Sequence, residues 1–368
     1  MKSHHSTNLL PDYYLPRLMD MAVTIIFLAG FSTGVLYGQT EQQRPESLFD
    51  FLSKKGQFIE LTLRTDMDEL INHRRREDYQ PAELFYSEEK KQERKWDIGV
   101  VPRGNYRRHV CIFPPIRFNF SRNQLEEQGL SPDFDKIKVV AHCQEGEEGD
   151  NYILKEFLVY KIYNQLTPNS YRVQLARITY LDTEGNYKKF KHFAILIEET
   201  DEMAHRLGGA EFEEYNPPPE AFNTEAENLM AVFQYMIGNE DWDYPMIRNM
   251  KLIQPSDSSG LIPIPYDFDF SGLVNAPYAI PSAQYGHSTL QERIFLGYPV
   301  RKEQLRKTLE HFHLYRSNIR AVIKGFKLLR FSERMRAIDY IESFFASEGS
   351  LIRENAVKFK EQKPGEDY

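Results

Sequence analysis

Residues 238–269, GNEDWDYPMIRNMKLIQPSDSSGLIPIPYDFD, hold five aspartates and two asparagines around two short apolar runs. The runs, Met250–Ile253 and Leu261–Pro265, have the length of β-strands. The polar residues flank them, where a fold can place side chains in a cleft without burying unpaired charge. The segment therefore predicts a site for a metal ion and phosphate groups. Its main candidate residues are Asp241, Asn249 and Asp267.

The length and the charge of the chain limit the classes of protein to consider. Its 368 residues exceed one compact core, so a two-lobed domain or two domains with a cleft are expected. A net charge of −8 argues against nonspecific nucleic-acid binding, which needs a cationic face. We therefore expect no nucleic-acid partner.

An apolar segment, Met21–Gly38, lies near the N-terminus and follows scattered basic residues. Its most hydrophobic part is short and small residues follow it, which favours a signal peptide cleaved near Gly38 over a membrane anchor. We expect residues 1–38 to be this signal peptide, with the anchor as the alternative, and residues 39–56 to be a linker. Cleavage would give an exported protein, periplasmic or extracellular, whose contact with a membrane is limited to this segment.

The chain has two cysteines, Cys111 and Cys143, each at or within a strand-like run. Their spacing does not show whether they meet, so a disulfide and two buried thiols are both open. Export would favour the disulfide. No histidine pair lies near them in the sequence, so they give no zinc signature.

Periodicity predicts a β-rich region over residues 57–200 and a mainly helical region over residues 201–368. Strands are expected at 57–64, 97–101, 107–113, 116–120, 136–143, 171–181 and 190–198. Helices are expected at 66–73, 150–166, 224–237 and, as two or three segments, 304–345. Residues 87–95 read as an exposed charged excursion, and the tail from Lys358 as loosely held.

Phosphoryl transfer needs a carboxylate that orients the attacking hydroxyl, two ligands for a divalent metal ion, and a cation on the phosphates that a glutamate keeps in place. The chain offers Asp241, Asn249, Asp267, Lys138 and Glu156 for these tasks. Glu156 lies on a helix with apolar residues all round, so its carboxylate would need a cationic partner.

The chain resembles the spore-coat CotH-type kinase-like family in motifs that lie between Arg103 and Ala279. The motifs are RGNYRR (103–108), CIFPPIRFNF (111–120), KIKVVAHC (136–143), KEFLVYKIYNQLTP (155–168), IEETDEMAHR (197–206), GNEDWDYPMIRNMKL (238–252) and PYDFDFSGLVNAPYA (265–279). The resemblance implies an α+β, atypical two-lobed protein-kinase-like fold with a β-rich N-lobe and a mainly helical C-lobe. It also implies transfer of the γ-phosphoryl group of ATP to a protein side chain, with Mg²⁺ or Mn²⁺.

The same resemblance assigns the acidic residues. Asp241 takes the place of the catalytic carboxylate, and Asn249 and Asp267 take the places of metal ligands. Asp269 assists at the metal. Asp243 is the fallback for either role.

On the nucleotide side, the resemblance implies that Lys138 holds the α- and β-phosphates and pairs with Glu156. Lys136 is the competing choice for the phosphate-binding lysine. The adenine would lie against the backbone near Glu198–Glu199.

Two departures from the family pattern matter. Eight positions separate Asp241 from Asn249, against five in ordinary kinase catalytic loops, so Asn249 reaches the metal only if Asp243–Ile247 bulges outward. The motif RGNYRR holds one glycine, so it is not a Gly-rich phosphate loop. Phosphate binding would then fall to side chains such as Arg103 or Arg107.

Other interpretations fit parts of the pattern. An exported non-catalytic protein could keep the scaffold for binding or structure, because a bacterial protein outside the cytoplasm meets little ATP. A metal-dependent hydrolase could use the same aspartates, although no water-activating His/Asp cluster is visible. Asp241 and Asn249 could also be ordinary turn formers, Lys138 a snorkelling edge residue and Glu156 an exposed helix residue.

Overall fold

A computed structural model of the chain describes residues 45–53, 56–87 and 93–368. These residues belong to one compact unit. The expected signal peptide or anchor at 1–38 and the first residues of the expected linker lie outside them. Within the described part, no helix has both the length and the apolar character needed to cross a membrane.

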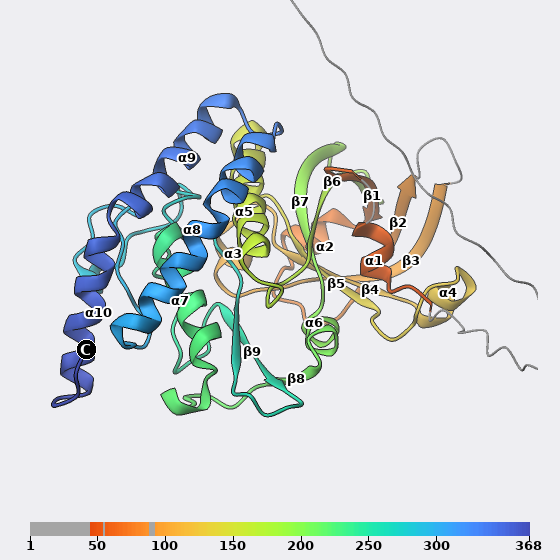
Figure 1. The fold of residues 1–368 in the computed structure, drawn as a ribbon. Helices are drawn as coiled ribbons and strands as arrows, with labels where there is room; N and C mark the ends of the chain where they lie inside the picture. The colour runs from red at the N-terminus through yellow and green to blue at the C-terminus, as the bar shows by residue number, and fades with distance from the viewer. Residues whose placement is uncertain (1–44, 54–55, 88–92) are drawn as a thin grey trace, which may run out of the picture. The chain divides into compact units, whose positions relative to one another are not determined.

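Seven strands close into a barrel in the order β1, β2, β3, β4, β5, β7, β6 (Figure 1). Neighbouring strands are antiparallel except β1 and β6, which run parallel and complete the ring. Side chains along β1 alternate in burial, as the two-residue period of a strand requires. The strands are β1 (Ile59–Thr65), β2 (Gln80–Ser87), β3 (Glu93–Pro102), β4 (Ile116–Phe120), β5 (Lys136–Val140), β6 (Val173–Asp182) and β7 (Phe190–Ile197).

The closed barrel shows that the predicted two-lobed kinase-like fold is wrong. The α+β class is right, but a closed seven-stranded barrel does not fit the β-rich N-lobe of that fold. The closure depends on the pairing of β1 with β6, in register from Ile59 opposite Ala176 to Thr65 opposite Asp182. This pairing joins segments far apart in the sequence, and the alternation within each strand says nothing about its partner.

Two local predictions for this region are also wrong. The expected excursion at 87–95 contains the end of β2 and the start of β3, and its residues 88–92 lie outside the described part. The strand expected at 107–113 is a short helix, α3 (Tyr106–Val110). A disulfide between Cys111 and Cys143 holds the end of this helix, and Arg74 Nη1 donates to the Cys111 carbonyl at 2.6 Å. The two cysteines are therefore bridged, which was one of the two open alternatives.

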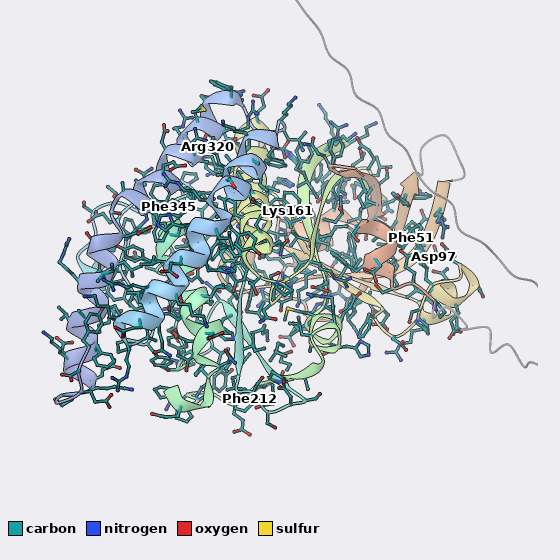
Figure 2. All side chains as sticks on the ribbon, viewed as in Figure 1. Phe51, Asp97, Lys161, Phe212, Arg320 and Phe345 are labelled. Carbon is teal, nitrogen blue, oxygen red and sulfur yellow. A yellow bond between two sulfur atoms is a disulfide. The ribbon has the colours of Figure 1, made fainter. Side chains whose placement is uncertain are left out.

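A short helix before the barrel, α1 (Leu48–Ser53), shares the barrel core. Phe49 and Leu52 are almost fully buried. Phe51 packs edge-on against Trp96 of β3, at the barrel end of the molecule in Figure 2. Part of the stretch expected as a linker is therefore a folded element.

The long helix α5 (Gly146–Leu166) lies between the barrel and the C-terminal helices, where it contacts β6, β7 and α8 (Figure 1). A second apolar core surrounds it and reaches Phe345 on α9 (Figure 2). The tail expected to be loose from Lys358 begins inside a helix, since α10 (Glu348–Gln362) includes Lys358 and ends four residues later. The remaining elements are α2 (Met67–Ile71), α4 (Arg122–Glu127), α6 (Thr200–Arg206), β8 (Gly209–Phe212), α7 (Thr224–Ile237), β9 (Met250–Pro255), β10 (Ile262–Pro265), α8 (Lys302–Gly325), α9 (Phe331–Ala346), α10 (Glu348–Gln362) and the 3₁₀ turns η1 (Pro219–Ala221) and η2 (Ala283–Tyr285).

The second sheet, in the order β10, β9, β8, contains both apolar runs of the opening segment. These runs are strands, as predicted, and they pair antiparallel with Met250 opposite Pro265. The helix before them, α7, ends at Gly238, as predicted, with φ +64°. Glycine adopts this left-handed conformation without strain. The loop after α7 and the loop after β10 therefore meet at one end of the β9–β10 pair.

Candidate functional site

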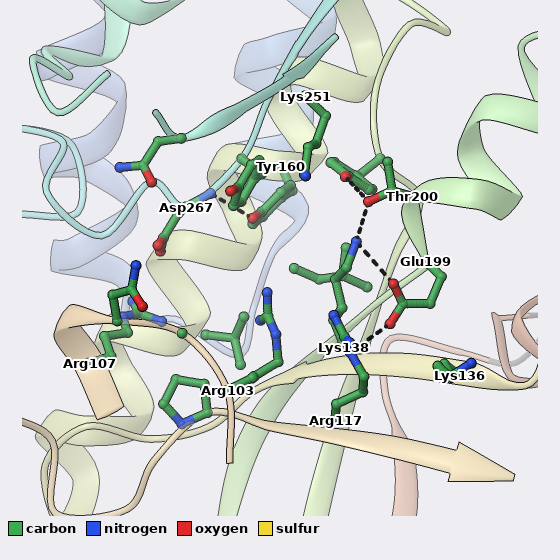
Figure 3. Close-up of a pocket in the computed structure, with 18 of the residues that line it drawn as sticks. Arg103, Arg107, Arg117, Lys136, Lys138, Tyr160, Glu199, Thr200, Lys251 and Asp267 are labelled. Atoms are coloured by element: carbon green, nitrogen blue, oxygen red, sulfur yellow. Dashed lines mark hydrogen bonds and ion pairs between the residues drawn. The ribbon is translucent and has the colours of Figure 1, made fainter. Parts of the chain in front are cut away.

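A cavity of about 1000 Å³ lies against β4 and β5 and beside the ends of β9 and β10. The predicted residues Lys138, Asp241, Asn249, Asp267 and Asp269 all line it. Figure 3 shows the Lys138 and Asp267 side chains on opposite sides of this space. The structure therefore brings most of the predicted site residues around one cavity.

The loop after α7 places Asp241 next to Asn249. Residues 244–247 form a turn that backbone hydrogen bonds between Asp243 and Arg248 close, so the eight-position separation does not keep the pair apart. Asn249 Nδ2 donates to the Asp241 carbonyl oxygen at 2.6 Å and to Asp241 Oδ2 at 2.8 Å. The Asn249 Oδ1 oxygen is then left for another partner. Asp243, the fallback residue, pairs with Arg248 at 3.0 Å.

Asp267 leaves the β9–β10 pair at the same end as Asn249, because the strands are antiparallel. Its backbone N–H donates to the Tyr160 hydroxyl oxygen at 3.0 Å. Its carboxylate makes no hydrogen bond or ion pair with any residue that the structure describes. Burial, together with the Asp269 charge, raises the pKa of Asp267 well above its ordinary value. A bound cation would relieve this unfavourable environment.

The backbone is strained around the same cavity. Ile247, Asn249 and Asp267 have φ values of +49°, +53° and +62°. Asparagine and aspartate tolerate this left-handed region better than most residues, but for a β-branched residue such as Ile247 it is an outlier. Strain of this kind persists where the surrounding structure enforces it and clusters at functional sites. Asn216, Ser258 and Asn275, which do not line the cavity, have positive φ as well, so this feature alone does not separate a functional site from ordinary turns.

Arg107 lies between two buried carboxylates. Its Nη2 is 2.5 Å from Glu156 Oε2, and its Nε is 2.7 Å from Asp269 Oδ2. Glu156 therefore has the cationic partner that its burial requires, but the partner is Arg107 and the predicted pair with Lys138 is not formed. The reason is the turn of the chain into α3, which directs Arg107 inward. Asp269, already paired, is less available to a metal ion than Asp267.

Lys138 is buried on β5 and its ammonium group already has partners. Its Nζ donates to Thr200 Oγ1 at 2.7 Å and lies 3.4 Å from Glu199 Oε2 (Figure 3). Burial lowers the pKa of Lys138 to about 8, although the Glu199 carboxylate opposes the shift. Lys136, the competing choice, pairs with Asp135 at 3.1 Å and is 39% exposed.

Sequence reasoning missed some contacts of the cavity. Glu199 was expected only as backbone near the adenine, but its side chain pairs with both Lys138 and Arg117, the latter at 3.1 Å. Arg117 and Lys138 lie opposite each other in β4 and β5, a pairing that neither strand sequence reveals. Glu198 is fully buried and binds Arg172 at 2.7 Å. Only Glu199 of the two lines the cavity.

The donor atoms fit a hard divalent cation. Among the described residues, no three histidine, cysteine, aspartate or glutamate side chains gather as a metal site. Mg²⁺ does not require such a group, because one or two carboxylates, water and phosphate oxygens complete its coordination. Asp267 with Asn249 Oδ1 meets that requirement for Mg²⁺ or Mn²⁺, whereas zinc would need nitrogen or sulfur ligands.

Comparisons with protein-family models and with curated proteins found no match to this chain. The function is therefore inferred from the geometry of the cavity and from the motifs that build it.

Proposed function

We propose that the chain transfers the γ-phosphoryl group of ATP to a hydroxyl group of a protein side chain, with Mg²⁺ or Mn²⁺ as cofactor. The observation that carries the proposal is the Asp267 carboxylate, which lines the cavity without a partner among the described residues. Cationic side chains line the same cavity. Metal-bound polyphosphate needs both kinds of surface, and a cavity of about 1000 Å³ accommodates a nucleotide.

Asp241 is the base in this proposal. Asn249 fixes its Oδ2 by a hydrogen bond, and burial raises the pKa of Asp241 while Arg248 opposes the shift. The acceptor oxygen forms a bond to the γ-phosphorus as the bond from that phosphorus to the β,γ-bridging oxygen breaks. The hydroxyl proton passes to the Asp241 carboxylate, and ADP leaves.

Asp267 and Asn249 would hold the divalent cation, which supplies positive charge against the phosphate oxygens. Asp269 acts through its charge, since Arg107 already binds its carboxylate. The phosphates would lie toward the barrel, where Lys138 and other cations line the cavity.

The proposal includes an exported protein that acts on another protein outside the cytoplasm, with a membrane anchor as the alternative to signal cleavage. The disulfide between Cys111 and Cys143 supports this location, because disulfides persist in oxidising compartments.

The test is calorimetric titration of the full chain with ATP and Mn²⁺, repeated with Asp267→Asn. Asparagine tolerates the left-handed backbone at this position, so the variant removes the charge and keeps the conformation. We expect the unmodified chain to bind and the variant to bind at least about tenfold more weakly. No binding by the unmodified chain would end the kinase proposal, and equal binding by both forms would end the role of Asp267.

Asp241→Asn then separates binding from transfer. It should bind ATP as tightly as the unmodified chain and lose the incorporation of label from γ-labelled ATP into protein. Loss of both would assign Asp241 a structural role.

A second candidate is an exported protein that binds without catalysis. The ion pairs of Arg107 with Glu156 and Asp269 favour it, because they leave fewer carboxylates for a metal ion. Nucleotide binding by the unmodified chain without any transfer would support this candidate.

A further inference from the structure

Arg103 differs from the other described cations that line the cavity. Each of the others has a carboxylate partner: these are Arg107, Arg117, Arg122, Lys136, Lys138, Arg248 and Lys251. The Arg103 side chain makes no hydrogen bond or ion pair with any residue in the described part of the chain. Its five donors are therefore free for a ligand.

The position of Arg103 is central in the cavity. Figure 3 shows its side chain rising between Asp267 on one side and Lys138 on the other. Its charge lowers the pKa of both groups, although neither lies within ion-pair distance of it. An anion between Arg103 and a cation at Asp267 would thus contact positive charge on two sides.

The backbone of Arg103 is held in place from two directions. Its N–H donates to the Pro115 carbonyl at 2.8 Å, directly after the last residue of β3. Gly104, with φ +79°, then turns the chain into α3, which the disulfide fixes. The side chain therefore extends from a rigid base into the cavity, which reduces the freedom that it would lose on binding.

A second guanidinium nitrogen without a partner belongs to Arg107, which also lines the cavity. Arg107 is 6% exposed, and its Nη1 has no hydrogen-bond partner although its Nε and Nη2 do. A buried guanidinium nitrogen without an acceptor is unfavourable, but Nη1 has almost no accessible surface, so a ligand in the cavity does not reach it as the side chains stand. Lys138 already contacts Thr200 and Glu199.

We propose that Arg103 is the principal phosphate-binding residue of the cavity, with Lys138 in a lesser role. The ligand class is a polyphosphate chain, because the planar fork of a guanidinium matches two phosphate oxygens at once. This inference rests on the proposed function. It assigns the main phosphate-binding role to Arg103, in the loop after β3, in place of Lys138 on β5.

The experiment is a titration of the full chain in Mn²⁺ with ATP, with inorganic tripolyphosphate and with adenosine. The variants are Arg103→Met, Arg103→Lys and Lys138→Met. Arg122→Met is the matched control, because it removes a cation from the cavity edge that is paired with Asp135 and 65% exposed.

We expect Arg103→Met to weaken ATP and tripolyphosphate binding about tenfold to hundredfold and to leave adenosine binding unchanged. Arg103→Lys should bind the two polyanions more weakly than the unmodified chain and more tightly than Arg103→Met, because an ammonium group is a point charge without the planar fork of a guanidinium. Lys138→Met should weaken both polyanions less than Arg103→Met does, and Arg122→Met should weaken them by less than about threefold.

Unchanged tripolyphosphate binding by Arg103→Met and Arg103→Lys would overturn the inference, as would a larger loss in Lys138→Met. Tripolyphosphate binding that depends on Arg103 without any ATP binding would sustain the anion site and end the kinase proposal. If the unmodified chain binds neither ligand, both proposals fail. Arg103→Lys keeps the charge and most of the packing, so its tripolyphosphate binding still tests the role of Arg103 if Arg103→Met unfolds.

Discussion

Asp267 combines several unfavourable features at one position. Its backbone is left-handed, its carboxylate lies near that of Asp269, and no described residue pairs with it. Features that lower stability and lie at one cavity are typical of functional sites. The residue should therefore be a place where stability and binding change in opposite directions.

Asp267→Asn should raise the free energy of unfolding of the metal-free protein by about 1 kcal/mol, because it removes a poorly solvated charge. The melting temperature should rise accordingly. The same variant should lose the rise that Mn²⁺ with ATP produces in the unmodified chain. Thermal unfolding in chelator and in Mn²⁺ with ATP measures both effects. Asp339→Asn, an exposed substitution on α9, is the control. A lower melting temperature for Asp267→Asn in chelator would contradict the argument.

Glu227 is a buried acid on α7, and among the described residues the Lys358 charge acts on it. Its Oε1 accepts hydrogen bonds from the Tyr244 hydroxyl and from the Tyr298 N–H. Burial raises the pKa of Glu227 to about 7, against 4.5 for an exposed glutamate, although both hydrogen bonds lower it.

This shift predicts a specific pH dependence. Between about pH 4.5 and 7 the folded chain holds a proton on Glu227 that the unfolded chain has released, so the free energy of unfolding falls as the pH rises through this window. The loss is at most about 3 kcal/mol and is complete above pH 7. Urea unfolding at several pH values, compared with Glu227→Gln, isolates the effect from other groups. Identical pH slopes for the two proteins would refute it.

At the scale of elements, α3 is the feature that shapes the site. The helix has five residues, too few to be stable alone, and its position depends on tertiary contacts. The disulfide joins its C-terminal end to the chain after β5, and Arg74 binds the Cys111 carbonyl. Through α3, the disulfide holds Arg107 between Glu156 and Asp269.

Replacing both cysteines by alanine should lower the free energy of unfolding by about 2 to 4 kcal/mol, since the bridge closes a loop of 32 positions. Hydrogen exchange should also speed up locally at residues 104–112, because α3 loses its covalent tie. Urea unfolding and exchange mass spectrometry test the two effects. Uniform exchange changes across the barrel, without a local maximum at α3, would show that the bridge does not position this helix.

The elements illustrate what local patterns can predict. The strand at 116–120 and the end of α7 at Gly238 follow from alternation and from helix-stop chemistry, and both were predicted. Helix α3 was not, because a covalent bond and a side chain from another segment determine it. The motif predicted that Asp241 and Asn249 belong to one site, but the hydrogen bonds between them were not predicted. The partner of Glu156 was predicted wrongly, since Lys138 and Arg107 are both cations and the choice between them depends on where α3 lies.

At the scale of the whole molecule, the closure of the barrel and the packing of α1 are the main findings. Neither follows from periodicity, because each depends on contacts between distant segments. Arg172 on the chain before β6 links the regions: it pairs with Asp50 of α1, with Glu198 after β7 and with Glu202 of α6. Helix α1 is therefore tied to the fold by charge as well as by burial.

Phe49→Ala in α1 should lower the free energy of unfolding by about 3 to 5 kcal/mol, because the side chain is 1% exposed and its loss leaves a cavity. Pro45→Ala, exposed and three residues before the helix, should have little effect. Denaturant unfolding of the two variants measures the difference. Equal stability would mean that the segment before β1 behaves as a linker.

The closed barrel also affects how the molecule meets other chains. A ring of paired strands presents no free edge, and the small sheet has edges only at β8 and β10 within the described part. Pro263 and Pro265 remove backbone donors from β10, and β8 has four residues. A second chain would find few strand edges to extend. The described fold should therefore resist edge-to-edge aggregation even when concentrated.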